Sequence, residues 1–365
     1  MIRETGLQKT IQIIASILLL AAAVAAVWAN DASPDALIEG NHWKRLGAFA
    51  EQKLRANPGD ANANYLMALA KFQYRDYDGA QPLAEKAVAL DPRNADHHYV
   101  LGIVYGRQAE RANIFRQPGL AGKFKKEEEQ AVALDPKHIN ARVALIDFHL
   151  EAPGLVGGDK KMAYKLADEI LQINAARGWL AKARIARKEK QLGELESFYR
   201  KAVAADPRNY SAQIALSSFF GSDGQKKYEL TEKHAREALA IAPGRADAYA
   251  QLAALFSFQQ RWKELDAILV QSEQNVPDNL SAYFHAGRVL VSNNLDAARA
   301  ERHLRKYLTQ PPEPNAPSLA AGHLWLGRAV EKQGRVDEAV RGYQEALRLD
   351  PKLEDAKKEL RRLKK

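Results

Sequence analysis

Residues 320–351 read AAGHLWLGRAVEKQGRVDEAVRGYQEALRLDP, and this stretch predicts two antiparallel helices joined by a tight turn. Gly327 and Ala339 are small enough to let the two helices approach closely, and Tyr343 is large enough to fill the space beside them. Gly334 suits the turn that reverses the chain, because glycine adopts the backbone conformations of tight turns without steric cost. The proline that closes the stretch marks the end of the second helix, which a proline cannot continue.

The same punctuation recurs along the chain. Eight prolines follow apolar helical patterns at intervals of 34, 44, 71, 36, 34, 34 and 40 residues: Pro58, Pro92, Pro136, Pro207, Pro243, Pro277, Pro311 and Pro351. A recurrence near 34 residues is typical of stacked helical hairpins, in which each unit buries its apolar face only against its neighbours. The sequence therefore predicts an all-α fold, a right-handed α-solenoid of stacked antiparallel helix hairpins with an N-terminal hydrophobic signal helix.

The longest interval, between Pro136 and Pro207, is about two repeats long and predicts a hidden hairpin that lacks its closing proline. Its two helices are expected over residues 139–151 and 160–174. The resulting organisation is a degenerate capping hairpin at 35–60, a repeat array at 61–352 and a basic capping helix at 353–365. The capping helix has a polar, basic side, as a terminal repeat that faces water requires.

These repeats resemble those of the tetratricopeptide repeat (TPR) family. Two units that match the family's pattern of aromatic, apolar, small and proline positions carry Tyr249, Leu252, Ala253, Phe256 and Pro277, and Tyr283, Gly287, Leu290 and Pro311. The resemblance covers roughly residues 35–365. It implies a non-enzymatic scaffold or adaptor that binds a protein, without catalytic residues, metal or cofactor.

The first 29 residues have a different character. Residues 10–28 are almost wholly apolar, and Val27, Trp28 and Ala29 end this run with residues at the positions that a signal peptidase reads. We expect a signal peptide at 1–29 that is cleaved on export to the periplasm. The alternative is an uncleaved anchor in the inner membrane, with the array facing the periplasm, because a run of this length just spans a bilayer of about 30 Å. A cytoplasmic protein with a buried first helix is a third interpretation.

Composition restricts the chemistry that the chain supports. It has no cysteine, which excludes disulfides and thiolate metal sites and is compatible with the periplasm. Its nine histidines are scattered over different repeats, and none forms an i, i+4 pair enclosing a glutamate, as in a helical metal site. The formal net charge is +9, and residues 352–365 carry seven basic residues against three acids. We interpret that tail as a solvated cap helix and expect no nucleic-acid partner.

Two glycine-containing segments interrupt the repeat rhythm. Residues 106–126 and 151–161 are predicted to be loop insertions between the helices of successive hairpins, and to lie side by side on one edge of the solenoid. They resemble loops of uncharacterised exported repeat proteins of proteobacteria. The glycines permit either a tight turn or an anion site made of backbone N–H groups. Residues of this candidate loop site, for an anion- or glycan-binding protein or a hydrolase, are Arg116, Lys123, Gly157, Gly158, Lys160 and Lys161.

The inner face of the superhelix is the second candidate site. The repeat register places basic and aromatic residues there, and these residues are Arg177, Arg184, Arg187, Phe284, His285, Arg288, Trp325, Arg328 and Lys332. Arginine binds carboxylates in a bidentate manner and aromatic side chains anchor interfaces, so this pattern predicts a groove for an extended, acidic peptide. The alternative interpretation is that an arginine-rich chain places arginine on every exposed face. The function expected from the sequence is a periplasmic scaffold, with a membrane-anchored accessory subunit of an envelope complex as the alternative.

Overall fold

The computed structural model describes residues 33–363, and within them the chain forms nineteen α-helices, two 3₁₀ helices and no strand. The predicted signal peptide or anchor at 1–29 lies outside the described residues, as do the last two residues of the predicted capping helix. The helices are α2 (Pro34–Gly40), α3 (Trp43–Ala56), α4 (Ala61–Gln73), α5 (Tyr77–Leu90), α6 (Ala95–Arg111), α7 (Gln117–Leu134), α8 (Ile139–Glu151), η1 (Gly154–Val156), α9 (Lys160–Ile173), α10 (Ala175–Lys188), η2 (Leu192–Glu194), α11 (Leu195–Ala205), α12 (Tyr210–Gly221), α13 (Tyr228–Ile241), α14 (Ala246–Phe258), α15 (Trp262–Asn275), α16 (Ser281–Ser292), α17 (Ala297–Tyr307), α18 (Leu319–Glu331), α19 (Val336–Leu349) and α20 (Glu354–Leu363).

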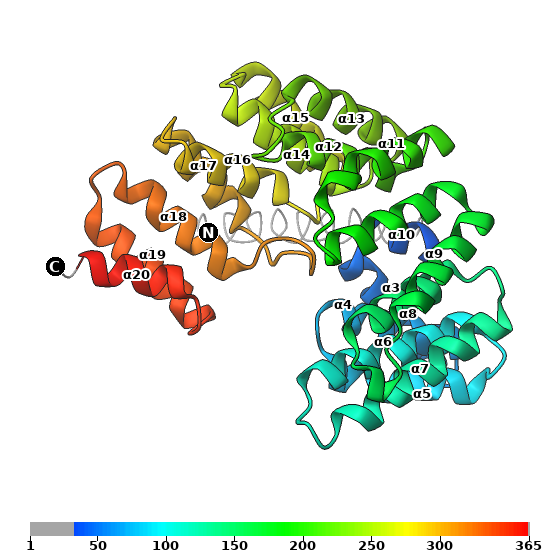
Figure 1. Cartoon of the computed structure of the whole chain (residues 1–365). Coiled ribbons are helices and arrows are strands. Elements are labelled where there is room, and N and C mark those ends of the chain that lie inside the picture. The colour runs from blue at the N-terminus through cyan, green and yellow to red at the C-terminus, as the bar shows by residue number, and fades with distance from the viewer. Residues whose placement is uncertain (1–32, 364–365) are drawn as a thin grey trace, which may run out of the picture.

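The α-helices form nine successive hairpins, from α2–α3 to α18–α19, and α20 packs against the last of them. Each hairpin also contacts the next, so that the array follows a curved path from the blue N-terminal end to the red C-terminal end (Figure 1). Stacking of this kind buries the apolar face of every internal hairpin on both sides. No helix between residues 33 and 363 is long and apolar enough to cross a membrane.

Side-chain caps explain where many of the hairpins begin. The side-chain oxygen of the residue before the helix accepts a backbone N–H at α4 (Asp60), α6 (Asn94), α12 (Asn209) and α18 (Ser318). Such caps satisfy N–H groups that have no partner inside the helix. The recurring linker, in which a proline is followed by an Asn, Asp or Ser cap, therefore ends one helix and starts the next.

The last hairpin shows the close approach that the sequence predicts. A Cβ atom on Gly327 would lie only 2.6 Å from Cε1 of Tyr343, so the glycine makes room for the ring. Tyr343 and Ala339 are fully buried. Gly334 has a φ of 78°, a left-handed conformation that glycine adopts without strain. The hidden hairpin is also present, since α8 and α9 occupy the expected ranges and α9 ends one residue early.

The prediction of a loop over residues 106–126 is wrong for most of that segment. Helix α6 continues to Arg111 and α7 begins at Gln117, so that only five residues connect them. The reason is packing inside the hairpin. Phe124 is 7% exposed, and its ring lies so close to Gly106 that a Cβ there would be 2.8 Å away. This contact holds the extended ends of the two helices together, where glycine, proline and basic residues had indicated a loop.

The N-terminal hairpin, α2–α3, contacts loops that lie far away in the sequence. Nδ1 of His42 lies 2.9 Å from Asp278 Oδ2, and Nε of Arg45 donates to the same oxygen at 3.0 Å. The Lys44 backbone N–H donates to the Glu313 carboxylate at 3.3 Å, and Lys44 Nζ donates to the Asp278 carbonyl at 2.8 Å. The hairpin therefore packs inside the curve of the array, beside the α15–α16 and α17–α18 loops, as Figure 1 shows. We call this set of contacts the clasp.

A buried carboxylic acid on α7 gives a testable stability prediction. Glu128 is fully buried, and neither of its carboxylate oxygens has a hydrogen-bond partner within residues 33–363. Burial, and secondarily the charge of Glu127, raises its pKa well above the ordinary value of a glutamate. Because the folded state holds the proton more tightly than the unfolded state, this group lowers stability as pH rises above the unfolded pKa.

We expect Glu128→Gln to increase the free energy of unfolding by on the order of 1 kcal/mol at pH 8, with a smaller change at pH 4. Urea denaturation at the two pH values measures this difference. The matched control is Glu129→Gln, because Glu129 is the exposed next residue on the same helix. Equal effects of the two substitutions at pH 8 would contradict the prediction.

Candidate functional site

A cavity of about 970 Å³ lies between the N-terminal hairpin and the middle of the array. Its walls come from α2, α3 and α10, and from the linkers that precede α12 and α14. In Figure 1 the blue N-terminal hairpin lies beside α10 at this place. The clasp thus forms one wall of the cavity.

Arginine dominates the polar lining of this cavity. Two acids, Glu39 and Asp206, face six arginines, which are Arg45, Arg177, Arg184, Arg187, Arg208 and Arg245. Three of the six come from α10, where spacings of seven and three residues place them along one side of the helix. The remaining three come from α3 and from the linkers before α12 and α14. We call this set the arginine cavity.

Half of these arginines have no acidic partner within residues 33–363. Arg177 donates to the Asn140 amide oxygen at 2.6 Å, Arg187 donates to the hydroxyl of Tyr199, and the guanidinium of Arg208 makes no hydrogen bond in this range. Burial lowers the pKa of Arg177, as is expected for a cation removed from water without a counter-ion. These three guanidinium groups are therefore available to an anionic ligand.

The other three arginines of the cavity are paired. Arg184 Nε donates to Asp147 at 2.6 Å, and Arg45 belongs to the clasp. Arg245 lies 3.5 Å from the Asp247 carboxylate and stacks on Tyr210, with its guanidinium carbon 3.8 Å from the ring centroid. The stacked pair places an aromatic face and a positive charge at one end of the cavity.

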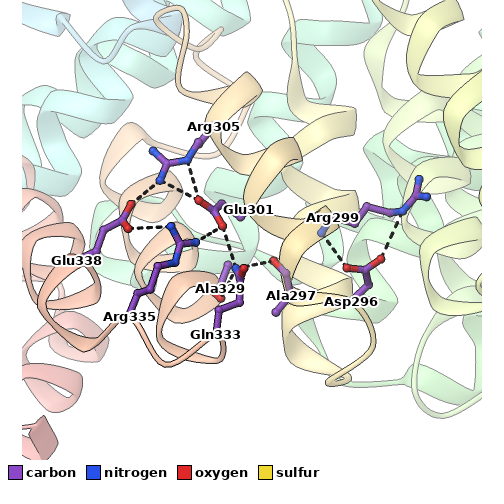
Figure 2. Close-up of polar contacts among 9 residues, drawn as sticks. All are labelled: Asp296, Ala297, Arg299, Glu301, Arg305, Ala329, Gln333, Arg335 and Glu338. Carbon is purple, nitrogen blue, oxygen red and sulfur yellow. Dashed lines mark hydrogen bonds and ion pairs between the residues drawn. The ribbon is translucent and has the colours of Figure 1, made fainter.

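Other arginines of the array are neutralised in networks. Figure 2 shows Glu301 of α17 joined to Arg305, Arg335 and Gln333, and Glu338 of α19 joined to the same two arginines. These ion pairs link α17 to the following hairpin. In the arginine cavity, by contrast, Arg177, Arg187 and Arg208 converge without such partners.

The structure separates the groove residues that the sequence grouped together. Only Arg177, Arg184 and Arg187 line the cavity. Phe284 is 4% exposed and packs against Tyr307, with ring centroids 5.2 Å apart, so it belongs to the core and its assignment to the groove is wrong. Its burial is set by the neighbouring helix α17, which the repeat register alone does not reveal.

The remaining groove candidates lie away from the cavity. Arg328 stacks on Trp325, and its guanidinium pairs with Asp355 and Glu359 of α20 at 3.1 and 2.8 Å. This guanidinium therefore already has acidic partners within the chain. Lys332 donates to the Asn294 side chain at 2.9 Å. Burial, and then the charge of Arg288, lowers the pKa of His285 to about 4, so this histidine is neutral near neutral pH.

The loop candidates do not form the expected anion site. The Gly157 and Gly158 N–H groups donate to the carbonyls of Gly154 and Pro153 at 3.0 and 3.2 Å, and Asp159 caps α9 with its own carboxylate. The Asp159 carboxylate already occupies this helix end and would repel a second anion, so the hypothesis of a backbone anion site is not supported. These glycines serve a tight turn, since Gly157 has a φ of 95° and a Cβ on Gly158 would collide with the Ala152 carbonyl.

The basic residues of that candidate site are dispersed. Lys123 lies within α7, with its Nζ 5.0 Å from the centroid of the Tyr105 ring, and Lys160 pairs with Glu189 at 3.1 Å. Arg116 immediately precedes α7, and Lys161 lies in the first turn of α9. The two segments do adjoin, because a Cβ on Gly157 would lie 3.3 Å from Nζ of Lys125. No group of three or more His, Asp or Glu side chains within residues 33–363 is arranged to hold a metal ion.

Comparison with known proteins agrees with this architecture. Residues 176–209 and 320–353 each match the sequence profile of the tetratricopeptide repeat. The chain is a tetratricopeptide repeat protein. The two matched segments contain α10–α11 and α18–α19, so one of them supplies the three arginines of α10. No curated protein matches the sequence.

Several solved structures are similar to this TPR protein at low sequence identity. Yeast Tom70 is 14% identical, with a TM-score of 0.46, and the match covers 90% of this chain and 79% of Tom70. A tetratricopeptide repeat protein from Parabacteroides merdae is also 14% identical with a TM-score of 0.46, covering 72% of this chain and 99% of that protein. TTC0263, a TPR protein from Thermus thermophilus, is 18% identical with a TM-score of 0.45, and the match covers 52% of this chain and 96% of TTC0263. Arrays of this repeat are protein-interaction scaffolds, and this TPR protein has that architecture.

Proposed function

We propose that this TPR protein is a non-enzymatic scaffold that binds an acidic, extended segment of a partner protein in the arginine cavity. The observation that carries the proposal is the set of three guanidinium groups, on Arg177, Arg187 and Arg208, that line one cavity without an acidic partner in the described chain. Arg177 is partly buried without a counter-ion, and Arg187 and Arg208 are exposed, so a carboxylate ligand supplies the missing acidic partner and gains charge-assisted hydrogen bonds.

The size and lining of the cavity favour a short peptide segment. Its volume of about 970 Å³ is near the upper end of the range for small-ligand pockets, so it accommodates a few residues of an extended chain. Leu180 and Ile241 also line it, and both are partly exposed, so they offer apolar surface between the charges. A segment that alternates acidic and apolar side chains therefore matches the lining.

The test measures binding of a fluorescein-labelled oligoglutamate peptide by anisotropy. We expect the triple substitution of Arg177, Arg187 and Arg208 by glutamate to weaken binding by about 100-fold or more, because each change removes a cation and adds a repulsive charge. Circular dichroism and thermal unfolding establish that the variant is folded.

The matched control changes the charge by the same amount outside the cavity. Arg93, Arg302 and Arg341 are exposed and make no ion pair within residues 33–363, and their replacement by glutamate leaves the lining intact. We expect this control triple to bind the peptide within a factor of about three of the native protein, through long-range electrostatics alone. Similar losses in both triples would contradict a specific site at the cavity.

We also propose that the scaffold works in the periplasm. The apolar run at residues 10–28 followed by a cleavage-like triplet supports export. Mass spectrometry of the protein from fractionated cells tests this proposal. A periplasmic protein that begins at Asn30 supports it, and an intact N-terminus in the membrane fraction supports the anchored accessory subunit instead.

A further inference from the structure

The turn between α6 and α7 exposes two large apolar side chains. Ile114 is 75% exposed and Phe115 is 91% exposed, although both lie in a structured turn. The Asn113 side chain accepts the backbone N–H groups of Phe115 and Arg116 at 3.2 and 3.1 Å. Its carbonyl accepts the N–H of Gln117 at 3.0 Å. The turn therefore presents the two apolar side chains outward in a defined conformation, and we call Ala112–Arg116 the α6–α7 tip.

The surroundings of the α6–α7 tip are strongly basic. Residues 107–126 contain six Lys or Arg residues and one acid, Glu110, which pairs with Arg107 at 2.7 Å. Four of the cations have no acidic partner in the described part of the chain: Arg111, Arg116, Lys123 and Lys126. Two of them, Arg111 and Lys123, lie over the aromatic rings of Tyr77 and Tyr105. This hairpin thus combines an apolar tip with unpaired cations on the turn and on both of its helices.

The neighbouring turn continues this surface. Leu155, in η1, is fully exposed, and its turn adjoins α7 where Gly157 approaches Lys125. On the first turns of α7, a Cβ added to Gly119 or Gly122 would meet nothing within 4 Å, so no other part of the described chain covers this face. The surface is therefore a convex projection of apolar and basic groups.

We propose that the α6–α7 tip docks on an anionic lipid bilayer, with Ile114 and Phe115 inserted at the level of the acyl-chain boundary and the surrounding cations against the headgroup phosphates. Charge complementarity selects this occupant, since four unpaired cations lie on the same hairpin as the apolar pair. A bilayer interface accepts a convex apolar end of any shape, whereas a protein would need a matching pocket. Leu155 on the adjacent turn adds a second insertion point.

The absence of cysteine from the chain allows a site-specific test on the full-length protein. Phe115→Cys, labelled with an environment-sensitive fluorophore, reports the polarity around the tip itself, so insertion of the N-terminal apolar run at another place does not mimic the signal. We expect a blue shift with vesicles of equimolar phosphatidylcholine and phosphatidylglycerol, and none with phosphatidylcholine alone. The matched control is Gly224→Cys, on the exposed and polar α12–α13 turn, where no shift is expected.

A second pair of variants separates the two parts of the surface. In a Phe115→Cys background, Ile114→Glu tests the apolar contact and Arg116→Glu with Lys126→Glu tests the charges. Each is expected to raise the lipid concentration for half-maximal shift by at least tenfold, while oligoglutamate binding in the arginine cavity stays unchanged. Equal shifts on neutral and anionic vesicles, or equal shifts at the two labelled sites, would overturn the proposal. A shift that appears only when a partner protein is added would also overturn it.

Discussion

Replacing Trp43 by alanine is expected to lower the free energy of unfolding by about 3–5 kcal/mol, the largest effect among the substitutions considered for this protein. Trp43 is 5% exposed and packs in the core of the N-terminal half with Leu37 and Leu66. It directly precedes Lys44 and Arg45, which make the clasp. The substitution therefore leaves a cavity in the core and loosens one wall of the arginine cavity.

Urea denaturation measures the loss of stability, and hydrogen exchange locates it. Amides of α2, α3 and the clasp loops are expected to exchange faster, while those of α18–α20 keep their native rates. Phe115→Ala is the matched control, because this aromatic residue is 91% exposed, and its stability change should stay within about 0.5 kcal/mol. A loss at Trp43 that is no larger than the control would show that the N-terminal hairpin is not packed as described.

The second large effect concerns pH and comes from Glu313. This residue is 1% exposed, and burial, together with the nearby charge of Asp278, raises its pKa to about 7. A raised pKa means that the folded state binds the proton more tightly than the unfolded state between about pH 4.5 and 7. Stability is therefore expected to fall as pH rises through that window.

We expect Glu313→Gln to increase the free energy of unfolding by about 2–3 kcal/mol at pH 8 and to change it little at pH 4. Urea titrations at several pH values measure the difference. Glu39→Gln is the control, because Glu39 is exposed and lies on α2, in the N-terminal hairpin that contacts Glu313. A Glu313→Gln protein whose stability keeps the native pH dependence would contradict the assignment.

Asp278 responds to pH in the opposite direction. Burial opposes its ionisation, but the contacts with His42 and Arg45 outweigh burial and lower the pKa to about 2. Its contribution to stability is therefore present above the ordinary pKa of an aspartate and is lost as pH falls towards 2. The clasp thus contains two acids with opposite effects on stability. Asp278 stabilises the folded protein when it is ionised, and Glu313 favours the folded protein when it is protonated.

The helical fold could be predicted because its determinants are local. Gly327, Gly334 and Tyr343 specify a hairpin within thirty-two residues, and the hidden hairpin was found from its helical pattern without a proline. The prediction for residues 106–126 is wrong because the glycines and the proline of this segment indicate a turn. The contact that makes it helical, Phe124 on Gly106, depends on how the two helices of that hairpin meet.

The candidate site could be predicted only in part. The arginines of α10 follow from one helix face, but Arg45, Arg208 and Arg245 reach the same cavity from other elements. Their convergence depends on the clasp, whose partners are separated by 233 to 269 positions. Arg208 and Arg245 follow Pro207 and Pro243 in equivalent linkers, a signal that points to one edge of the array but not to a shared cavity.

The clasp also changes how this array should unfold. In a linear solenoid each repeat is stabilised only by contacts with its neighbours, so distant repeats open independently. Here residues 42–45 are joined to Asp278 and Glu313, so the opening of one end of the arc removes contacts from the other. The chain from α2 to the α17–α18 loop thereby becomes one cooperative unit. The hairpin α18–α19 and helix α20 lie beyond that closure and are free to fray alone, as the last repeats of an open array do.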